Sequence, residues 1–376
     1  MGQKNSLTPE TGELIELTID SLSYFGGRGV GRFEGVVVFV PQTAPQERIR
    51  ARVTAKKSRF WEAELVEVLS PSPSRRVPPC AVAGRCGGCS WQHVVYSVQV
   101  EQKSKILRES LRKLHGFEWL PFLEAPSEFH YRNRIQLQLR GGKKGFFALR
   151  TRDLIPIESC TIAEEILNDE MRTLEPADLA GHQRLELALT EEGRVMRHAG
   201  NRDPETAVFA QVNRDQNEVL KRRLVDLVQI APDWIMDLYS GSGNLTYPLR
   251  DRFLGVPITA VEGSREAVAR GRMRAPDVEW FAGDVERILS RLKERPGQGL
   301  VVLDPPRTGA SQHVLQDLAR LRPRQILYVS CNPMTFARDA LRLCGLGEYR
   351  LEKVQGLDMF PQTEHVELLA SLCTAT

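Results

Sequence analysis

The segment Asp237-Leu238-Tyr239-Ser240-Gly241-Ser242-Gly243-Asn244 joins a short apolar run to a helical pattern through a glycine-rich turn. Glycines in such a turn let a ligand approach the backbone, although two glycines alone also fit a simple tight turn. The dinucleotide fingerprint G-x-G-x-x-G is absent, because Thr246 stands where the third glycine is needed. The turn therefore favours a ligand other than a nicotinamide dinucleotide.

From about residue 233 onwards, apolar runs alternate with helical stretches, which is typical of α/β proteins with a parallel, doubly wound sheet. The predicted strands span residues 234–239, 258–261, 300–303 and 325–329. Glu262, Asp284 and Asp304 follow strand-like runs, and acids at the carboxyl ends of strands bind nucleosides in such sheets. No phosphate-binding lysine of the G-x-x-x-x-G-K type is present, so the nucleoside should carry little phosphate. This pattern resembles the class I S-adenosylmethionine-dependent methyltransferases.

Cys331 lies just past the strand predicted at 325–329 and should face the same crevice as Asp304. The alternative is an inert core cysteine, which is how we interpret Cys344 and Cys373. A methyltransferase needs a nucleophilic thiol when the acceptor is carbon 5 of a pyrimidine, because that carbon is a poor nucleophile. Thiolate addition to carbon 6 activates carbon 5, and a base must then remove the carbon-5 proton.

The segment Phe360-Pro361-Gln362-Thr363-Glu364-His365-Val366-Glu367 contains candidates for that base. In an extended strand His365 and Glu367 share one face, opposite Val366 and Leu368. If the apolar pair faces the core, Glu367 is the candidate base and His365 a supporting group. Without Cys331, a solvated C-terminal strand would be the better interpretation.

Two motifs resemble the signatures of RNA uracil-5 methyltransferases, namely Ser330-Cys331-Asn332-Pro333-x-Thr335-x-Ala337-Arg338-Asp339 and Phe360-Pro361-x-Thr363-x-His365-Val366-Glu367. Phe209-x-Gln211-x-Asn213 resembles the segment that begins their catalytic domain. The resemblance implies that Cys331 is the nucleophile and that Glu367 removes the proton. It also implies S-adenosylmethionine as the methyl donor, in a pocket that holds the cofactor and the target base and is lined by Gln211, Tyr239, Asn244, Glu262, Asp284 and Asp304.

The residue after Asp304-Pro305-Pro306 bears on which base is methylated. Arg307 stands there, whereas amino-group methyltransferases carry an aromatic residue that holds the adenine. The motif also lacks the second cysteine of cytosine-5 RNA methyltransferases. Uracil is therefore the expected base, and another base is the alternative.

Four of the seven cysteines form a cluster in the sequence, with Cys80, Cys86 and Cys89 close together and Cys160 further along. Four thiolates suit a structural zinc ion or an iron–sulfur cluster, and the spacing alone does not decide between them. The C-x3-C-x2-C run of a radical enzyme is absent. In the resembled subfamily this spacing binds a [4Fe–4S] cluster, so the resemblance implies a cluster of that kind with a structural role.

Short β-branched runs with glycine-rich connections between residues 14 and 68 predict a small OB-like barrel, which resembles the TRAM domain of ribosomal-RNA members of the family. Arg48, Arg50 and Arg52 alternate there and should share one strand face. A second basic block with interleaved aromatic residues covers 131–150. Such surfaces suit single-stranded RNA through phosphate attraction and base stacking, with a solvated strand face as the alternative.

The composition is that of an ordinary globular protein, with 376 residues, 51 Lys and Arg, 48 Asp and Glu and a net charge of +3. It contains neither a run of about 18 apolar residues nor the apolar core of a signal peptide, so we expect a cytoplasmic protein without a membrane partner. We predict three domains. They are an OB-like barrel (10–72), a small α+β domain with the cysteine cluster and basic block (73–208), and a Rossmann-like methyltransferase domain (209–376).

The predicted reaction is methylation of carbon 5 of a specific uridine in RNA. The presence of both barrel and cysteine cluster favours 23S ribosomal RNA, by resemblance, over the same reaction on tRNA. A non-catalytic iron–sulfur RNA-binding protein is the alternative from another class, and it would bind RNA without using S-adenosylmethionine. No protein partner is implied, and we expect a monomer.

Overall fold

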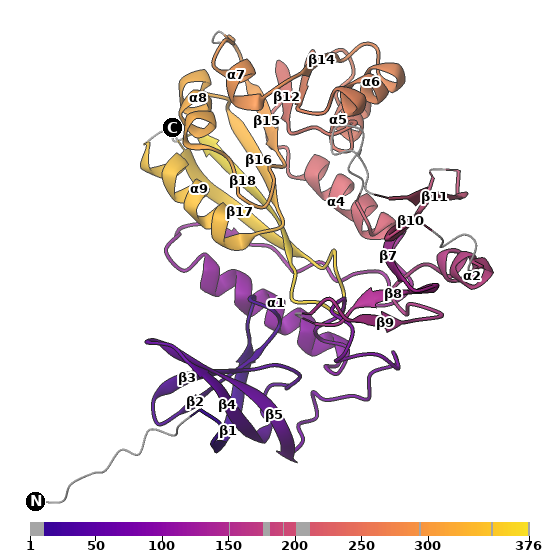
Figure 1. Ribbon diagram of the computed structural model, residues 1–376. Coiled ribbons are helices and arrows are strands. Elements are labelled where there is room, and N and C mark those ends of the chain that lie inside the picture. The colour runs from indigo at the N-terminus through magenta and orange to yellow at the C-terminus, as the bar shows by residue number, and fades with distance from the viewer. Residues whose placement is uncertain are drawn as a thin grey trace, which may run out of the picture.

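The computed structural model describes residues 11–149, 151–175, 181–190, 192–200, 211–292, 295–346 and 349–374. These residues form a closed five-stranded barrel, a five-stranded sheet and an eight-stranded sheet, which follow one another along the chain except that β6 of the eight-stranded sheet precedes the five-stranded one (Figure 1). Phe209 of the F-x-Q-x-N motif and Arg150 of the second basic block lie outside the described residues. Within the described ranges, no helix has the length and apolar character needed to span a bilayer.

The N-terminal barrel has the strand order β1-β2-β3-β5-β4, as expected for an OB-like fold. Alternate residues of β1, such as Ile15, Leu17 and Ile19, point inward and are buried, whereas the residues between them are exposed. The five strands are β1 (Leu14–Leu22), β2 (Gly29–Phe33), β3 (Val36–Val40), β4 (Arg48–Lys56) and β5 (Phe60–Ser70).

The arginines of β4 share the outer face of the barrel, as their alternation predicts, but each one pairs with a carboxylate of a neighbouring strand. The pairs are Arg48–Glu16 at 2.9 Å, Arg50–Glu16 at 2.8 Å, Arg50–Glu67 at 2.7 Å and Arg52–Glu64 at 3.3 Å. Exposed pairs of this kind stabilise a fold by only about 0–1 kcal/mol each. Their main effect is to balance the charge of this face, which therefore lacks the free cations expected from the sequence.

The central sheet has the order β11-β10-β7-β8-β9, and helix α2 packs on it. The basic block lies mainly in β7 and β8. Its elements are β7 (Arg134–Arg140), β8 (Lys143–Phe147), β9 (Leu154–Pro156), α2 (Glu165–Thr173), β10 (Arg184–Leu189) and β11 (Val195–Ala199).

The C-terminal sheet has the order β14-β13-β12-β15-β16-β18-β17-β6, in which the five strands from β14 to β16 run parallel and β18 is antiparallel to both its neighbours. All four strands predicted here are present. The strands are β6 (Glu118–Trp119), β12 (Trp234–Leu238), β13 (Ile258–Glu262), β14 (Glu279–Ala282), β15 (Gly299–Leu303), β16 (Gln325–Ser330), β17 (Tyr349–Leu357) and β18 (Glu367–Thr374).

Helices cover both faces of this sheet. Helices α1, α7, α8 and α9 contribute to the hydrophobic core on one face, and α4, α5 and α6 to the core on the other. Strand β18 is therefore buried almost throughout, so a solvated C-terminal strand is wrong. The helices are α1 (Tyr96–Ser110), α4 (Arg214–Asp226), α5 (Thr246–Arg252), α6 (Arg265–Arg274), α7 (Val285–Leu289), α8 (Gln312–Leu321) and α9 (Pro333–Gly345).

Helix α1 and strand β6 come from the segment predicted as the central domain, yet they complete the C-terminal unit. Strand β6 pairs with β17, and Ile106 and Leu107 of α1 belong to the same hydrophobic cluster as Phe336 of α9 and Val354 of β17. Figure 1 shows α1 between the barrel and the C-terminal sheet. The boundaries of the three domains stay predictions, and the packing shows that the middle segment is divided between two structural units.

Helix α1 is tied to the loop that precedes β18 by a buried ion pair. The ammonium group of Lys103 donates to Asp358 Oδ1 at 2.6 Å and to the carbonyl oxygen of Phe360 at 3.0 Å, and both ionic side chains are fully buried. Breaking such a pair leaves an uncompensated buried charge. The loop from Asp358 to Val366 therefore depends on α1 for its position.

We expect Lys103→Met to lower the free energy of unfolding by about 3–5 kcal/mol, because Asp358 then lacks its cation. Lys105→Met on the same helix is the matched control, since Lys105 pairs with Glu101 at an exposed site and should contribute about 1 kcal/mol or less. Chemical denaturation followed by circular dichroism measures both variants. Equal losses would contradict the importance of the buried pair.

Candidate active site

The glycine-rich turn after β12 has a backbone that depends on its glycines. Gly241 has a φ of 56° and Gly243 a φ of 105°, and Tyr239 just before them also has a positive φ, of 64°. A Cβ atom on Gly243 would lie 2.6 Å from the ring of Tyr247, so that position has no room for a side chain. Glu262, at the end of β13, accepts hydrogen bonds from the backbone N–H of Gly241 at 3.0 Å and of Ser264 at 2.7 Å. The acid therefore fixes the backbone of the turn relative to the end of β13.

A pocket at the carboxyl ends of β12 and β15 brings together four of the six residues predicted to line the cofactor and base pocket. These are Gln211, Tyr239, Asn244 and Asp304. Glu262 contacts the turn that lines this pocket. Asp284 is exposed at the start of α7, where its Oδ1 accepts from the N–H of Arg287 at 2.9 Å.

The pocket contains two asparagines that sequence reasoning missed. Asn217 on α4 exchanges two amide hydrogen bonds with Asn244, at 2.8 and 3.0 Å. Asn133 donates from Nδ2 to the carbonyl oxygen of Gln211 at 3.0 Å. Asn217 could have been noticed from the sequence, because it lies one helical turn after Asn213 of the F-x-Q-x-N motif. Its hydrogen-bond partner, Asn244, could be identified only from the tertiary structure.

Two buried carboxyl groups with raised pKa values line this pocket. Burial raises the pKa of Asp237 and that of Asp304 to about 7. Asp237 accepts from the hydroxyl of Thr246 at 2.6 Å through Oδ2, whereas its Oδ1 is buried without a hydrogen-bond partner among the described residues. An unsatisfied buried acceptor at a pocket wall fits a ligand that brings a donor or a positive charge, as S-adenosylmethionine does.

Cys331 lies between β16 and α9, on a segment that is bonded to the Asp304–Arg307 loop. Asn332 caps α9 by accepting from the N–H of Met334 at 3.1 Å, and its Nδ2 donates to the carbonyl oxygen of Arg307 at 3.0 Å. Such caps are preferred at helix starts because they satisfy free backbone N–H groups. The nucleophile predicted from the sequence is thus held on the same edge of the sheet as the cofactor pocket.

Arg307 connects the thiol with the segment before β18. Its Nη2 donates to Nδ1 of His365 at 3.0 Å, and because a guanidinium only donates, this ring nitrogen carries no proton. Burial lowers the pKa of His365, which agrees with a neutral ring. His365 precedes β18 instead of lying within it, so the shared strand face predicted for His365 and Glu367 does not form.

The electrostatics place Cys331, Glu367 and Arg307 in one interacting group. Burial, with the charge of Glu367 adding to it, raises the pKa of Cys331 to about 11, and a hydrogen bond and charge from Arg307 oppose the rise. Burial also raises the pKa of Glu367 well above its usual range, with Asp304 adding and Arg307 opposing. Glu367 is only 3% exposed. Arg307 is therefore a cation that favours the ionised form of both groups.

We expect Arg307→Gln to raise the pKa of the Cys331 thiol and to lower methyl transfer at pH 7.5 by about tenfold or more, since one pKa unit corresponds to a factor of ten in thiolate. The rate should then rise with pH through a midpoint displaced to higher pH. Arg307→Lys keeps the charge and should retain more activity. A pH–rate profile of the three proteins measures this. Unchanged midpoints would contradict the assigned role.

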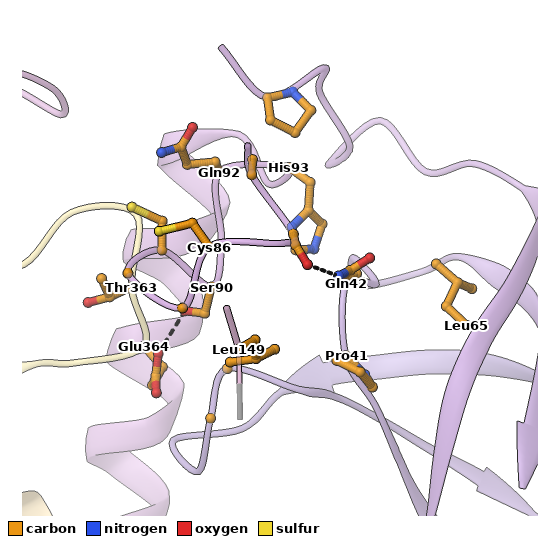
Figure 2. Close-up of a pocket in the computed structure, with 18 of the residues that line it drawn as sticks. Pro41, Gln42, Leu65, Cys86, Ser90, Gln92, His93, Leu149, Thr363 and Glu364 are labelled. Atoms are coloured by element: carbon orange, nitrogen blue, oxygen red, sulfur yellow. Dashed lines mark hydrogen bonds between the residues drawn. The ribbon is translucent and has the colours of Figure 1, made fainter. Parts of the chain in front are cut away.

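The loop before β18 is held by α1 and by the barrel. Gln99 donates to Gln362 Oε1 and accepts from its backbone N–H, both at 2.9 Å, which supports the unusual φ of 69° at Gln362. In the barrel, the ring of Tyr24 packs edge-on against His365 of this loop with 6.5 Å between centroids, and its hydroxyl donates to the carbonyl oxygen of Cys331 at 3.1 Å. Figure 2 shows Ser90 pointing toward Glu364, to which its hydroxyl donates at 2.7 Å. Helix α1, the barrel and the segment that carries Ser90 therefore all contact the loop before β18.

The four cysteines predicted as metal ligands line a single pocket between the segment 80–89 and the central sheet. Burial raises the pKa of Cys89 to about 12, and Cys160, Cys86 and Cys80 add to the rise through their proximity. Within the described ranges, no three metal-ligating side chains are placed as they would be around an ion. The donor set, four partly buried thiols, still suits a tetrathiolate group chemically.

Comparison with known proteins agrees with this arrangement. A family model for tRNA (uracil-5-)-methyltransferases matches residues 286–373, which include Arg307, Cys331 and Glu367. An RNA methyltransferase of Bdellovibrio bacteriovorus is 41% identical, with 98% of each chain covered. The 23S rRNA (uracil(1939)-C(5))-methyltransferase RlmD of Pseudomonas entomophila is 32% identical, with 92% of this chain and 90% of the relative covered.

The fold is similar to that of a solved structure over nearly its full length. The tRNA (uracil-54, C5)-methyltransferase of Pyrococcus abyssi, solved in complex with S-adenosyl-L-homocysteine, matches with a TM-score of 0.73 and 25% identity. The match covers 95% of this chain and all of the other. With relatives of this identity along nearly the whole chain, the protein belongs to the RNA uracil-5 methyltransferases, which are S-adenosylmethionine-dependent enzymes.

Proposed function

We propose that the protein methylates carbon 5 of a uridine in 23S ribosomal RNA through a covalent adduct with Cys331. The observation that carries this proposal is the grouping of Cys331, Arg307 and Glu367 beside the pocket that Asp237 and Asp304 line. The names of the RlmD relatives support ribosomal RNA as the substrate.

The first step joins the protein to the target base. The Cys331 thiolate adds to carbon 6, and the electron pair of the C5–C6 double bond moves to carbon 5 and the carbon-4 oxygen. Arg307 favours the thiolate that this step needs. S-adenosylmethionine supplies the methyl group to carbon 5 and leaves as S-adenosylhomocysteine. The adduct then carries both a methyl group and a proton on carbon 5.

The second step releases the product. The carboxylate of Glu367 takes the carbon-5 proton, the C5–C6 double bond forms again, and the Cys331 thiolate leaves carbon 6. A carboxyl group with a raised pKa is a stronger base than an exposed one once it is ionised. The neutral ring of His365, fixed by Arg307, positions the segment that leads to Glu367.

A uridine within folded RNA must leave its stack to reach a half-buried thiol, as in base-flipping enzymes. Contacts from the barrel and from residues 131–150 stay predictions, as do the cytoplasmic location and the monomeric state. Methylation of tRNA is the second candidate, because the Pyrococcus abyssi enzyme with the same fold is named for tRNA uracil 54.

Tritium release from carbon-5-labelled uridine tests the proposal directly. The purified protein is incubated with S-adenosylmethionine and either labelled 23S ribosomal RNA or labelled tRNA. Release from ribosomal RNA alone is the expected result. Release from tRNA alone would identify tRNA, instead of ribosomal RNA, as the substrate. Release from neither RNA would overturn carbon-5 chemistry on these RNAs.

We also propose that Cys80, Cys86, Cys89 and Cys160 hold a [4Fe–4S] cluster. Their position in one pocket beside the central sheet supports this assignment. When bound, such a cluster would join the segment 80–89 to Cys160 and so stiffen the wall that carries Ser90. The hydrogen bond from Ser90 to Glu364 would connect that wall to the catalytic loop.

For an anaerobically purified protein, we expect Cys86→Ser to remove most of the iron and the absorbance near about 400 nm, because a thiolate ligand is lost. Cys344→Ser is the matched control, since Cys344 lies on α9 away from this pocket and should leave both unchanged. Iron and zinc analysis accompanies the spectra. A colourless wild-type protein that contains zinc would reject the iron–sulfur assignment.

A further inference from the structure

A groove of about 730 Å³ lies between the barrel, helix α1 and helix α9, next to Cys331 but outside the cofactor pocket. We name it the α1–α9 groove. Its walls come from residues 21–25 of the barrel, 105–114 at the end of α1, and one face of α9 from Met334 to Arg342. That stretch of α9 is about 12 Å long at 1.5 Å per residue, so the groove is long enough for more than one nucleotide.

The groove continues from the reacting thiol. Tyr24, which lines it, donates its hydroxyl hydrogen bond to the carbonyl oxygen of Cys331 at 3.1 Å. Met334, at the other wall, lies in the first turn of the helix that follows Cys331. Because the target uridine lies within a longer RNA chain, nucleotides on both sides of it must continue away from Cys331.

Positive charge prevails along the groove. Five basic residues and one acid line it, and the acid, Glu109, pairs with Arg112. Lys113 and Arg342 are exposed, and neither forms an ion pair with a described residue. This contrasts with the outer face of β4, where each arginine has a carboxylate partner.

Large apolar side chains are exposed in the same groove. Phe25 is 62% exposed, Met334 48% and Leu341 39%. The ring of Phe25 packs edge-on against Tyr24, with 5.6 Å between their centroids, which leaves a face of an aromatic pair available. Aromatic surfaces beside unpaired cations match single-stranded nucleic acid, whose bases stack while its phosphates attract the cations.

We propose that the α1–α9 groove binds the single-stranded RNA on one side of the target uridine. Phe25 stacks on a flanking base, and Lys113 and Arg342 contact phosphates. The proposal deepens the function proposed above, since it names where the substrate continues beyond the reacting base. It also means that the barrel contacts the substrate RNA beside the active site.

The test measures binding of a 23S ribosomal RNA fragment centred on uridine 1939, by fluorescence anisotropy without S-adenosylmethionine and at several salt concentrations. The double variant Lys113→Gln/Arg342→Gln should bind about tenfold more weakly and reduce the slope of log affinity against log salt by about 1.4, for two lost phosphate contacts at about 0.7 each. Phe25→Ala should also weaken binding about tenfold, with an unchanged slope, because stacking releases no counterions.

Arg291→Gln is the matched control, because Arg291 is exposed beyond the end of α7 and lies outside the groove. Fragments trimmed on one side of the uridine then locate the contact. The loss caused by the groove variants should disappear with one trimmed fragment and persist with the other. Unchanged affinity and slope, or a loss that persists with both trimmed fragments, would overturn the proposal.

The outcomes separate this inference from the proposed function. If wild-type protein binds the fragment through the groove but releases no tritium from it, the fragment is not the substrate. The groove would still be an RNA-binding site. If release occurs only from tRNA, the same variants are measured on that RNA. If tritium is released from the fragment but the groove variants bind it as tightly as wild type does, the groove proposal is wrong and the proposed function is unaffected.

Discussion

Cys331→Ala is expected to abolish methyl transfer, with a loss of more than about 10⁴-fold, because it removes the thiol that bonds to carbon 6 in the proposed reaction. The substitution removes only the thiol. The backbone carbonyl that accepts from Tyr24 and the cap of α9 by Asn332 remain, so the fold and RNA binding should persist. Tritium release measures the loss of turnover.

RNA that contains 5-fluorouridine reports the adduct itself. Fluorine on carbon 5 cannot leave as a proton does, so wild-type protein should stay bound to this RNA on a denaturing gel. Cys331→Ala should give no such band, whereas Cys344→Ala, which removes a partly buried thiol on α9, should behave as wild type. A persistent adduct in Cys331→Ala would identify another nucleophile.

Glu367→Gln is expected to trap the adduct on natural RNA and to lower turnover by about 10²–10⁴-fold, the usual contribution of a positioned base. Glutamine has nearly the same shape, so the buried position is filled, but its amide cannot accept the carbon-5 proton. Thiolate addition and methyl transfer still occur, and elimination does not. Denaturing gels should therefore show a methylated covalent complex that wild type does not accumulate.

Glu364→Gln is the matched control for that variant. Glu364 lies on the loop that precedes Glu367, and its carboxylate accepts from the hydroxyl of Ser90, so it is not the proposed base. It should turn over RNA without accumulating the complex. Adduct levels in Glu367→Gln no higher than in wild type would count against Glu367 as the base.

The pH dependence of the wild-type rate should follow from the same two groups. The pKa of Glu367 and that of Cys331 are both raised by burial, and both groups act in their ionised forms. The rate should therefore increase with pH across the neutral range, because the ionised fractions increase. Arg307 opposes the increase in both pKa values, so the midpoint of the pH–rate profile lies at a lower pH than burial alone would produce.

Much of the C-terminal sheet was predictable because its strands are short apolar runs buried between helices. The runs at β12, β13, β15 and β16 have no polar alternation, since both faces of the sheet are covered. Strand β6, with two residues, was not predictable, because its pairing with β17 depends on contacts between distant segments.

The residues of the candidate site were likewise predictable only in part. Cys331 and Glu367 were predicted as nucleophile and base from two short motifs that resemble the signatures of the family. Arg307 was noted only as a departure from other methyltransferases, because its contact with His365 joins positions far apart in the chain. The charge balance on β4 was also missed, since its carboxylate partners come from two other strands.

The sequence by itself determined the α/β class and the barrel, because these depend on local periodicity. It supplied the nucleophile and base candidates and the expected S-adenosylmethionine chemistry through motifs that resemble a known family. Only the tertiary structure decided which charges are free, how α1 and the barrel hold the loop before β18, and where a groove opens beside Cys331. Electrostatic and packing energies depend on distances between side chains, and folding alone sets those distances.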